Sequence, residues 1–256
     1  VVCVIMGGIS VNVIAQPDSV EITRYRAEQG DPEAQTRLGF WFAQGIHVAK
    51  DDAQSAQWYG RAAAQGVSRA QTALGKLLMR GGVGVAKNES EAMQWLEKAA
   101  AAGDAEAQYE LGLAYEEGRG HARDMTAAMR WYLCSAQKEY GPAEARLGWL
   151  YYAGQGVRQD TNQALNWFKK SAEKGAADAQ TALGNLYLRG HGMTANPRQA
   201  AYWFRKAADQ GDPAAQFRLG QLYASGSGVA KNTKTAVAWY QRAAGSGLAE
   251  AQYQLG

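Results

Sequence analysis

The sequence is short of cysteine, of proline and of clustered charge. Its two cysteines, Cys3 and Cys134, form no closely spaced pair of the kind that binds metals. The 27 basic residues are nearly matched by 24 acidic ones, and no basic run exceeds two residues. Nucleic-acid binding needs a clustered excess of Lys and Arg, so we expect no nucleic-acid partner. With 46% hydrophobic residues, the chain is too apolar to be disordered and has the composition of a globular protein.

Residues 1–15 carry no charge, and the first charged residue is Asp18. The stretch is too short and too interrupted by Gly, Ser and Asn to predict a membrane span. It fits the apolar core and cleavage region of an export signal, so we predict a truncated signal-peptide remnant at 1–15. The alternative is a buried strand or helix. We therefore expect an exported chain, periplasmic or secreted, with no stable membrane span. Loss of the signal would remove Cys3 and leave Cys134 without an intrachain partner.

A repeat of about 36 residues runs through the rest of the chain, as in helical repeat proteins. The dipeptide Leu-Gly recurs in steps of 36 or 37 residues, at Leu38, Leu74, Leu111, Leu147, Leu183, Leu219 and Leu255. A tryptophan follows each of the first six leucines by 20 or 21 residues: Trp58, Trp95, Trp131, Trp167, Trp203 and Trp239. We divide the chain into a half repeat at 16–32, six repeats at 33–68, 69–105, 106–141, 142–177, 178–213 and 214–249, and a truncated seventh at 250–256.

Each copy is predicted to form two helices, called helix A and helix B. Helix A begins near an Ala-Gln pair such as Ala34-Gln35, and its apolar residues recur at steps of three and four. A glycine suited to left-handed backbone ends it in every copy: Gly45, Gly81, Gly118, Gly154, Gly190 and Gly226. Helix B starts at an Asp or Asn that fits an N-cap: Asp51, Asn88, Asp124, Asp160, Asn196 and Asn232. The glycine after each repeat Leu lies inside helix A, which indicates close approach of the backbone of a neighbouring helix.

The consensus A-Q-x-x-L-G-x-x-Y-x-x-G-x-G-V, followed by A-x-x-W-Y-x-K-A-A-x-x-G, resembles the Sel-like repeat (SLR) family, relatives of the tetratricopeptide repeats. The resemblance covers about residues 18–256. It implies an all-α fold, a right-handed superhelix (solenoid) of antiparallel helix pairs. It also implies a non-enzymatic scaffold that binds a protein or peptide and uses no cofactor; bacterial members are often exported. Because a solenoid needs polar caps, we expect the natural protein to continue past Gly256.

Two Ser-x-x-Lys matches, Ser135 to Lys138 and Ser171 to Lys174, suggest a competing function. This spacing places a nucleophile beside a base in penicillin-recognising enzymes, so the alternative is an envelope hydrolase directed at lactams or peptidoglycan. Both serines occupy a column that is alanine in the other copies, and no Ser-Asp-Asn or Lys-Thr-Gly accompanies them. We therefore favour a protein that is not an enzyme.

Histidines and the second cysteine are the remaining candidates for chemistry. The three histidines, His47, His121 and His191, fall in A–B turns of different copies, so we interpret them as solvated turn residues and predict no metal site. Cys134 occupies a column that is otherwise basic, which predicts an exposed outer face of helix B. The basic members are Arg61, Lys98, Lys170, Lys206 and Arg242. We expect Cys134 to be partly exposed; a redox role and an acidic partner for the basic column are the less favoured alternatives.

The third copy departs most from the repeat, through His121, Glu139 and Glu144. Glu139 replaces the glycine that ends helix B, and Glu144 replaces the Gln that opens the next helix A. These changes indicate a bend at this joint or a functional site. We favour the bend, because the missing glycine acts directly on the joint between repeats.

Helix A is expected to line the concave side of the solenoid, where such proteins bind partners. Counted from each repeat Leu, position +3 is always apolar and is assigned to the core, whereas positions −2, +2 and +5 form one variable stripe. Large apolar residues on this stripe are typical binding anchors: Phe40, Tyr109, Leu113, Trp149, Tyr152 and Phe217. Arginines at position −1 would pair with carboxylates or carbonyls: Arg37, Arg146 and Arg218. The alternative for the stripe is packing between neighbouring helices A.

Overall fold

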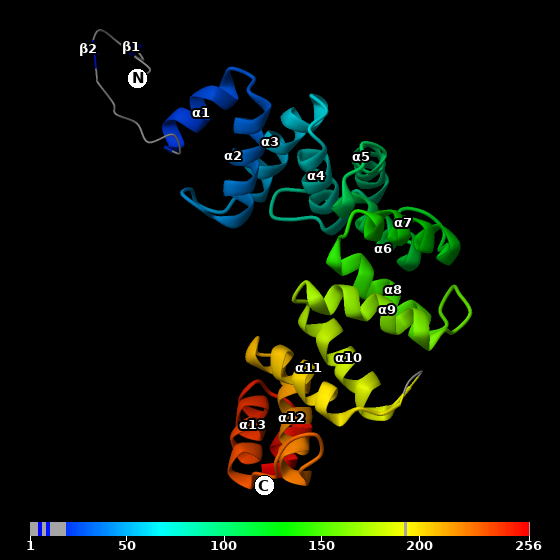
Figure 1. Cartoon of the computed structure of the whole chain (residues 1–256). Helices are drawn as coiled ribbons and strands as arrows, with labels where there is room; N and C mark the ends of the chain where they lie inside the picture. The colour runs from blue at the N-terminus through cyan, green and yellow to red at the C-terminus, as the bar shows by residue number, and fades with distance from the viewer. Residues whose placement is uncertain (1–4, 7–8, 11–18, 192–193, 256) are drawn as a thin grey trace. The chain divides into compact units, whose positions relative to one another are not determined.

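The computed structural model describes residues 5–6, 9–10, 19–191 and 194–255 (Figure 1). Near the start of the chain, β1 (Ile5–Met6) and β2 (Ile9–Ser10) form an antiparallel pair with Met6 opposite Ile9. The rest of the segment predicted as an export signal lies outside the described residues. Among the helices that are described, none is long and apolar enough to cross a membrane.

Fourteen α-helices make up most of the described chain, in the predicted alternation of helix A and helix B. The helices A are α2 (Pro32–Gln44), α4 (Ser68–Arg80), α6 (Ala105–Glu117), α8 (Gly141–Ala153), α10 (Ala177–Arg189), α12 (Pro213–Ser225) and α14 (Ala249–Leu255). The helices B are α1 (Val20–Glu28), α3 (Asp52–Ala64), α5 (Glu89–Ala101), α7 (Met125–Gln137), α9 (Thr161–Glu173), α11 (Pro197–Asp209) and α13 (Thr233–Gly245).

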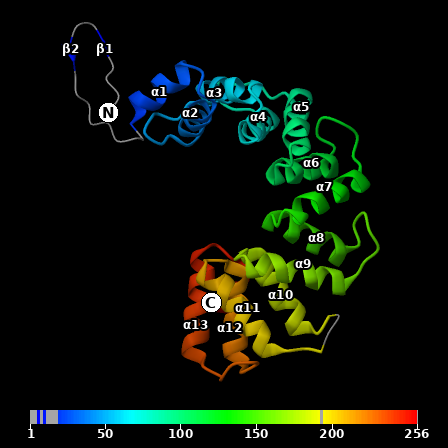
Figure 2. The same cartoon turned by 45° about the horizontal axis from the view of Figure 1, so that its top comes forward.

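The chain divides into two compact units, Val1–Asp124 and Met125–Gly256. Within the first unit, α1 to α6 pack on one another in chain order (Figures 1 and 2). Within the second unit, α7 to α14 do the same. A helix A also contacts the helix A of the following repeat, as α2 does with α4, α4 with α6 and α8 with α10. The predicted all-α solenoid of helix pairs is confirmed.

The helix ends follow the capping residues that the sequence predicts. The N-H of each helix A C-cap glycine bonds to a carbonyl four residues earlier, and all but one of these glycines are left-handed, with φ of 70–79°: Gly45, Gly118, Gly154, Gly190 and Gly226. Gly81, in the longer second copy, has φ 74° and ψ 179°. Six helices B begin at a side-chain N-cap, five of them at a predicted Asp or Asn: Ser19, Asp51, Asn88, Asp160, Asn196 and Asn232. Each such cap is worth about 1 kcal/mol, so the repeat sets its own helix boundaries.

The interior glycine of helix A makes room for a ring or a leucine from helix B. A Cβ at Gly148 would lie 2.6 Å from the ring of Phe168, and one at Gly184 would lie 2.7 Å from Phe204. Tyr59, Leu96 and Tyr240 take the same place against Gly39, Gly75 and Gly220. The neighbouring helix does come close, but the group that comes closest is the side chain after the repeat tryptophan and not the backbone that we predicted.

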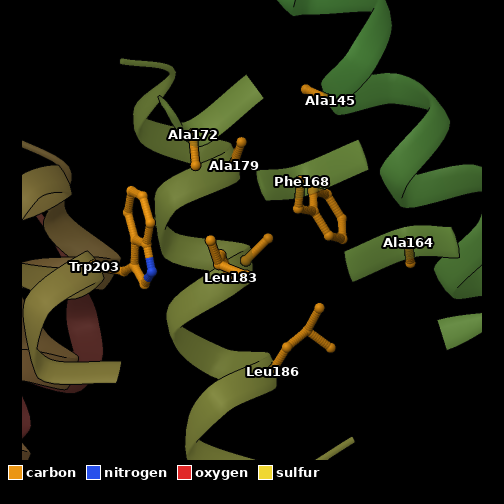
Figure 3. Packing of buried hydrophobic residues seen from close by; sticks show 9 residues of the cluster. Ala145, Ala164, Phe168, Ala172, Ala179, Leu183, Leu186 and Trp203 are labelled. Atoms are coloured by element: carbon orange, nitrogen blue, oxygen red, sulfur yellow. The ribbon is translucent and has the colours of Figure 1, made fainter. Parts of the chain in front are cut away.

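The core of the second unit shows how these side chains interlock (Figure 3). Phe168 of α9 and Leu183 of α10 are 1% and 0% exposed, and Trp203 of α11 packs in the same cluster. Small residues such as Ala164 and Ala179 lie in the same core and are fully buried. Interdigitation of large and small side chains gives the close packing that holds one repeat to the next.

A glutamine joins every described helix A except α8 to the helix B before it, and it is buried in all of these copies but the last. The side-chain amide nitrogen donates to the backbone carbonyl eight residues earlier, at 3.0–3.4 Å, in six copies: Gln35, Gln71, Gln108, Gln180, Gln216 and Gln252. The acceptor is an alanine at the end of helix B, whose carbonyl also accepts from the backbone N–H of the glycine that ends the helix, as Ala63 does from Gly66. This bond explains why the Ala-Gln pair recurs.

The joint before α8 uses different chemistry. Glu139 has φ 60°, in the left-handed region that glycine occupies at the equivalent position elsewhere. Glu144 is 2% exposed, and its Oε1 accepts a 2.6 Å hydrogen bond from Lys174 Nζ, which also donates to the carbonyl of Glu139. A charged pair therefore replaces the glutamine at the one copy that lacks both the glutamine and the glycine.

Candidate binding surfaces

The Ser-x-x-Lys matches lie in packed surroundings. Ser135 and Ser171 are both 0% exposed. The Ser171 hydroxyl donates to the carbonyl of Gly141 at 3.0 Å. Lys174 is held by Glu144 and Glu139, as described above. The geometry therefore favours a structural role for these serines, because a nucleophile must be reachable by its substrate.

The histidines of the A–B turns contact aromatic rings. His47 packs edge-on against Trp41 with ring centroids 4.9 Å apart, His121 lies 3.9 Å from Tyr115, and His191 stacks on Tyr152 at 6.5 Å. Over residues 19–191 and 194–255, no cluster of three or more His, Cys, Asp or Glu is arranged to hold a metal ion.

The basic column of helix B is exposed, as predicted, and it also covers the repeat tryptophans. Each cation lies over the ring three residues before it, at 4.2–5.4 Å from the ring centroid: Arg61 over Trp58, Lys98 over Trp95, Lys170 over Trp167, Lys206 over Trp203 and Arg242 over Trp239. Such cation–π contacts contribute about 0.5–1 kcal/mol at exposed sites. Cys134 takes this position in the third copy and is partly buried, which agrees with the expected partial exposure.

Position +3 of helix A lies in the core, as predicted. Its members are 0–6% exposed: Trp41, Leu77, Ala114, Leu150, Leu186 and Leu222. Solvent exposure varies much more among the residues of the variable stripe beside this position. Phe40 and Trp149 are 47% and 39% exposed, whereas Tyr109, Leu113 and Phe217 are half-buried. Phe217 packs on Tyr240 with centroids 5.5 Å apart, which is the packing alternative for the stripe.

The stripe residues Trp149 and Tyr152 line a small pocket of the second unit, here called the aromatic pocket. Its volume is about 120 Å³, and Arg189, His191 and Arg218 complete its polar lining together with Asn185. The Trp149 ring meets Phe168 edge-on at 5.0 Å and Tyr152 edge-on at 6.0 Å. A cavity of about 150 Å³ holds a benzene ring, so this pocket matches one side chain of a partner.

The aromatic pocket joins predicted and unpredicted residues. Trp149, Tyr152 and Arg218 come from α8 and α12, as the stripe and its arginines suggest. Asn185 is the +2 residue of the next copy, so the stripe itself could have indicated it. Arg189 and His191, at the end of α10 and in the following turn, carry no signal of their own, because only packing of consecutive copies brings them to the pocket.

A larger hollow, here called the basic groove, lies in the first unit, with a volume of about 770 Å³. It is lined by parts of α2, α3, α4 and α6, and the predicted residues Arg37 and Phe40 belong to it. Its other charged residues were not predicted: Glu33, Lys50, Arg69, Lys76, Arg80 and Glu106. The predicted residues Tyr109, Leu113, Arg146 and Phe217 line neither hollow.

Charges inside the basic groove shift the pKa of nearby groups. Burial raises the pKa of Tyr59 to about 12, and the carboxylate of Glu106 adds to that shift. Burial lowers the pKa of Lys76, but its hydrogen bond and charge interaction with Glu106, helped by Glu110 at 3.6 Å, outweigh burial and raise it. Burial also raises the pKa of Glu110 in spite of Lys76. Lys76 is thus neutralised locally by carboxylates of α6.

Comparison with protein families identifies the repeat. A model of the Sel1 repeat matches six segments of the chain, at residues 32–67, 68–104, 105–140, 141–175, 177–212 and 213–248. No curated protein matches the sequence. The Sel-like resemblance read from the repeat is confirmed.

Solved structures with the same repeat superpose well on the chain. One is c5321, described as a protective antigen present in uropathogenic Escherichia coli strains with an SLR fold; it is 35% identical, with a TM-score of 0.82 over 92% of this chain. The chain spans 50% of that protein. A Sel1 repeat protein from Oxalobacter formigenes is 34% identical, with a TM-score of 0.83. The match covers 92% of this chain and 68% of that protein. The immunity protein PA5088 from Pseudomonas aeruginosa is 21% identical, with a TM-score of 0.55, and the match covers 86% of this chain and 82% of that protein. This likeness shows a shared fold alone.

Proposed function

Because the chain belongs to the Sel1 repeat family, whose members generally mediate protein–protein interactions, we propose that it is a non-enzymatic scaffold of a bacterial cell envelope. It binds a protein or peptide partner through its helix A surfaces. The proposal includes export to the periplasm or beyond. Its supports are the uncharged residues 1–15 and the likeness to an E. coli protein described as a protective antigen.

The observation that carries this proposal is the aromatic pocket. Trp149 is 39% exposed although its ring rests on buried Phe168, so a large apolar surface is held rigidly at the protein surface. Rigid exposed aromatics with arginines beside them are typical of residues that dominate the energy of protein interfaces. We assign Arg189 and Arg218 to partner carboxylates or carbonyls.

Affinity capture tests the proposal directly. Immobilised wild-type protein and the variants Trp149→Ser, Arg189→Glu and Tyr202→Ser are exposed to bacterial envelope extract, and the prey are identified by mass spectrometry. Tyr202 is 49% exposed on α11 and lies outside the aromatic pocket, so it is the matched control. We expect a prey that the wild type and the Tyr202 variant retain and that both pocket variants lose.

The captured prey is then purified and titrated against each variant by calorimetry. Removing a central anchor of an interface costs about 2 kcal/mol or more, which is at least a 20-fold rise in Kd. Arg189→Glu leaves the core intact, since Arg189 is exposed, and it separates loss of binding from loss of folding. Equal affinity of the wild type and both pocket variants would show that the partner does not bind at this pocket.

A further inference from the structure

The basic groove concentrates positive charge in a nearly neutral chain. Five basic side chains and two acidic ones line it, so the excess is three positive charges. That equals the formal net charge of +3 of the whole chain. A hollow with an excess of one sign of charge raises the local concentration of oppositely charged ligands.

Some of these cations are already engaged by carboxylates of the first unit. Lys76 pairs with Glu106 and Glu110, and Arg80 lies 3.4 Å from the buried carboxylate of Asp52. Lys50 and Arg69 are exposed, and neither has an ion-pair partner in the part of the chain that the structure describes. These two side chains are therefore available to an incoming anion.

An apolar surface lies beside the charges. Phe40 of α2 is 47% exposed, and Ala73 and Leu77 of α4 line the groove with it. Tyr59 is 6% exposed and packs against Gly39 on the same helix as Phe40. The volume of about 770 Å³ falls in the range of sites that enclose a ligand of several side chains.

We propose that the basic groove binds an extended acidic segment of a partner protein, with carboxylates at Lys50 and Arg69 and an apolar side chain against Phe40. This inference deepens the proposed function and rests on it, because it gives the chemistry of a partner for the helix A surface of the first unit. The mixture of an apolar anchor with Glu33 and Glu106 favours a peptide over a nucleic-acid backbone, which needs an unbroken row of cations.

A labelled peptide provides the test. The probe is a fluorescein-labelled ten-residue peptide of Asp and Glu with one central Phe, titrated with the full chain by fluorescence anisotropy. One twin carries Asn and Gln in place of the acids, and another carries Ser in place of Phe. We expect the amide twin to bind at least tenfold more weakly and the Ser twin at least threefold more weakly. Raising NaCl from about 50 to 500 mM is expected to raise the Kd of the acidic peptide about tenfold, because salt screens exposed charges.

Charge-reversal variants locate the binding. Lys50→Glu and Arg69→Glu each raise the Kd of the acidic peptide at least fivefold, and Phe40→Ser raises it without changing the salt dependence. The matched control is Arg24→Glu, the same charge change on an exposed residue of α1 in the same unit, which leaves the Kd within twofold. Circular dichroism spectra equal to those of the wild type show that each variant is folded.

Three results would overturn the inference. They are equal binding of the amide twin, an unchanged Kd in both Lys50→Glu and Arg69→Glu, and displacement of the peptide by a ten-nucleotide thymidine strand at equal concentration. Failure of the proposed function looks different, because Trp149→Ser and Arg189→Glu lie in the second unit and leave the peptide Kd unchanged. If the peptide binds but no prey depends on Trp149, only the proposal for the aromatic pocket is refuted. If a prey depends on Trp149 but the peptide does not bind, only the proposal for the basic groove is refuted.

Discussion

Lys174 donates a 2.6 Å hydrogen bond to the buried carboxylate of Glu144 at a position where two other repeats pair glutamine with glutamine. The equivalent bonds run from Gln65 to Gln35 and from Gln210 to Gln180, both at 2.8 Å. The repeat thus keeps one contact between the start of helix A and the end of its own helix B, and exchanges a neutral pair for a charged one. The exchange accompanies the loss of glycine at Glu139, whose carbonyl Lys174 also binds.

This pair predicts a test of its energetics. Lys174→Met leaves the Glu144 carboxylate buried without a counter-charge. We expect it to lower the free energy of unfolding by about 2 kcal/mol, less than for a fully buried pair because the Lys174 side chain is 36% exposed. The double variant Glu144→Gln/Lys174→Gln restores the neutral pair of the other repeats and is expected to lie within about 1 kcal/mol of the wild type. Urea unfolding followed by circular dichroism measures both. A double variant as unstable as Lys174→Met would show that the glutamine pair cannot replace the charged one here.

Backbone strain at Glu139 predicts a stabilising substitution. A non-glycine residue in left-handed backbone costs about 1 kcal/mol, so Glu139→Gly is expected to raise the free energy of unfolding by roughly 0.5–1 kcal/mol. Gly175→Ala is the opposite change at the equivalent position, where φ is 99° and an added Cβ meets nothing within 4 Å. We expect it to be destabilising by a similar amount. Unfolding midpoints that move in the same direction for both variants would argue against strain at this turn.

The interior glycines of helix A predict opposite effects for two Gly→Ala changes. Gly148→Ala puts a Cβ 2.6 Å from the Phe168 ring and is expected to lower the free energy of unfolding by about 1–3 kcal/mol through overpacking. Gly60→Ala, inside α3, meets nothing within 4 Å and is expected to raise it by about 0.5–1 kcal/mol, because alanine favours helix. Thermal unfolding distinguishes them. Stabilisation by Gly148→Ala would refute the packing described for α8 and α9.

The raised pKa of Tyr59 predicts an alkaline loss of stability. The folded protein favours the neutral phenol, whose pKa of about 12 exceeds the ordinary 10.0. Its contribution is therefore complete below pH 10 and is lost as the pH rises from about 10 towards 12. Tyr59→Phe removes the titration, and phenylalanine stands at this position in α9 and α11 as Phe168 and Phe204.

We therefore expect Tyr59→Phe to unfold at the same urea concentration as the wild type at pH 8 and at a higher one at pH 11. The exposed Tyr202→Phe serves as control and should follow the wild type at both values. Absorbance at 295 nm during an alkaline titration gives the ionisation of the tyrosines independently. A wild type and Tyr59→Phe that lose stability equally between pH 10 and 11 would contradict the burial of this phenol.

Periodic features could be predicted from the sequence, and features that depend on the meeting of two copies could not. The N-cap at Asp51, the C-cap at Gly45 and the burial of Leu150 follow from local rules that repeat six times. The bond from Gln35 to the carbonyl of Ala27 did not follow, because the sequence shows that a glutamine recurs and not what it contacts. For the same reason Trp149 could be predicted as an exposed aromatic, whereas Arg189 and His191 could not be predicted as its neighbours in the pocket.

Surface charge shows the same limit. The basic column on helix B was predicted as an exposed face, but its stacking on the tryptophans requires the helical phase and side-chain direction to be known together. In the basic groove, Arg37 and Phe40 were predicted from their own helix, whereas Lys50 and Arg69 come from a turn and from the next repeat. Charge summed along the chain conceals this local excess.

The glutamine joint also bears on how such chains change length in evolution. Each glutamine satisfies a carbonyl only eight residues away, and each interior glycine faces a side chain of its own helix pair. Any stretch of about one and a half copies therefore contains all the residues that make these contacts. Duplication or deletion of a whole copy leaves every remaining joint with its donor and acceptor, so copy number can vary without new compensating mutations. The Glu144–Lys174 pair also lies within one copy, and only its contact with the carbonyl of Glu139 reaches into the copy before it.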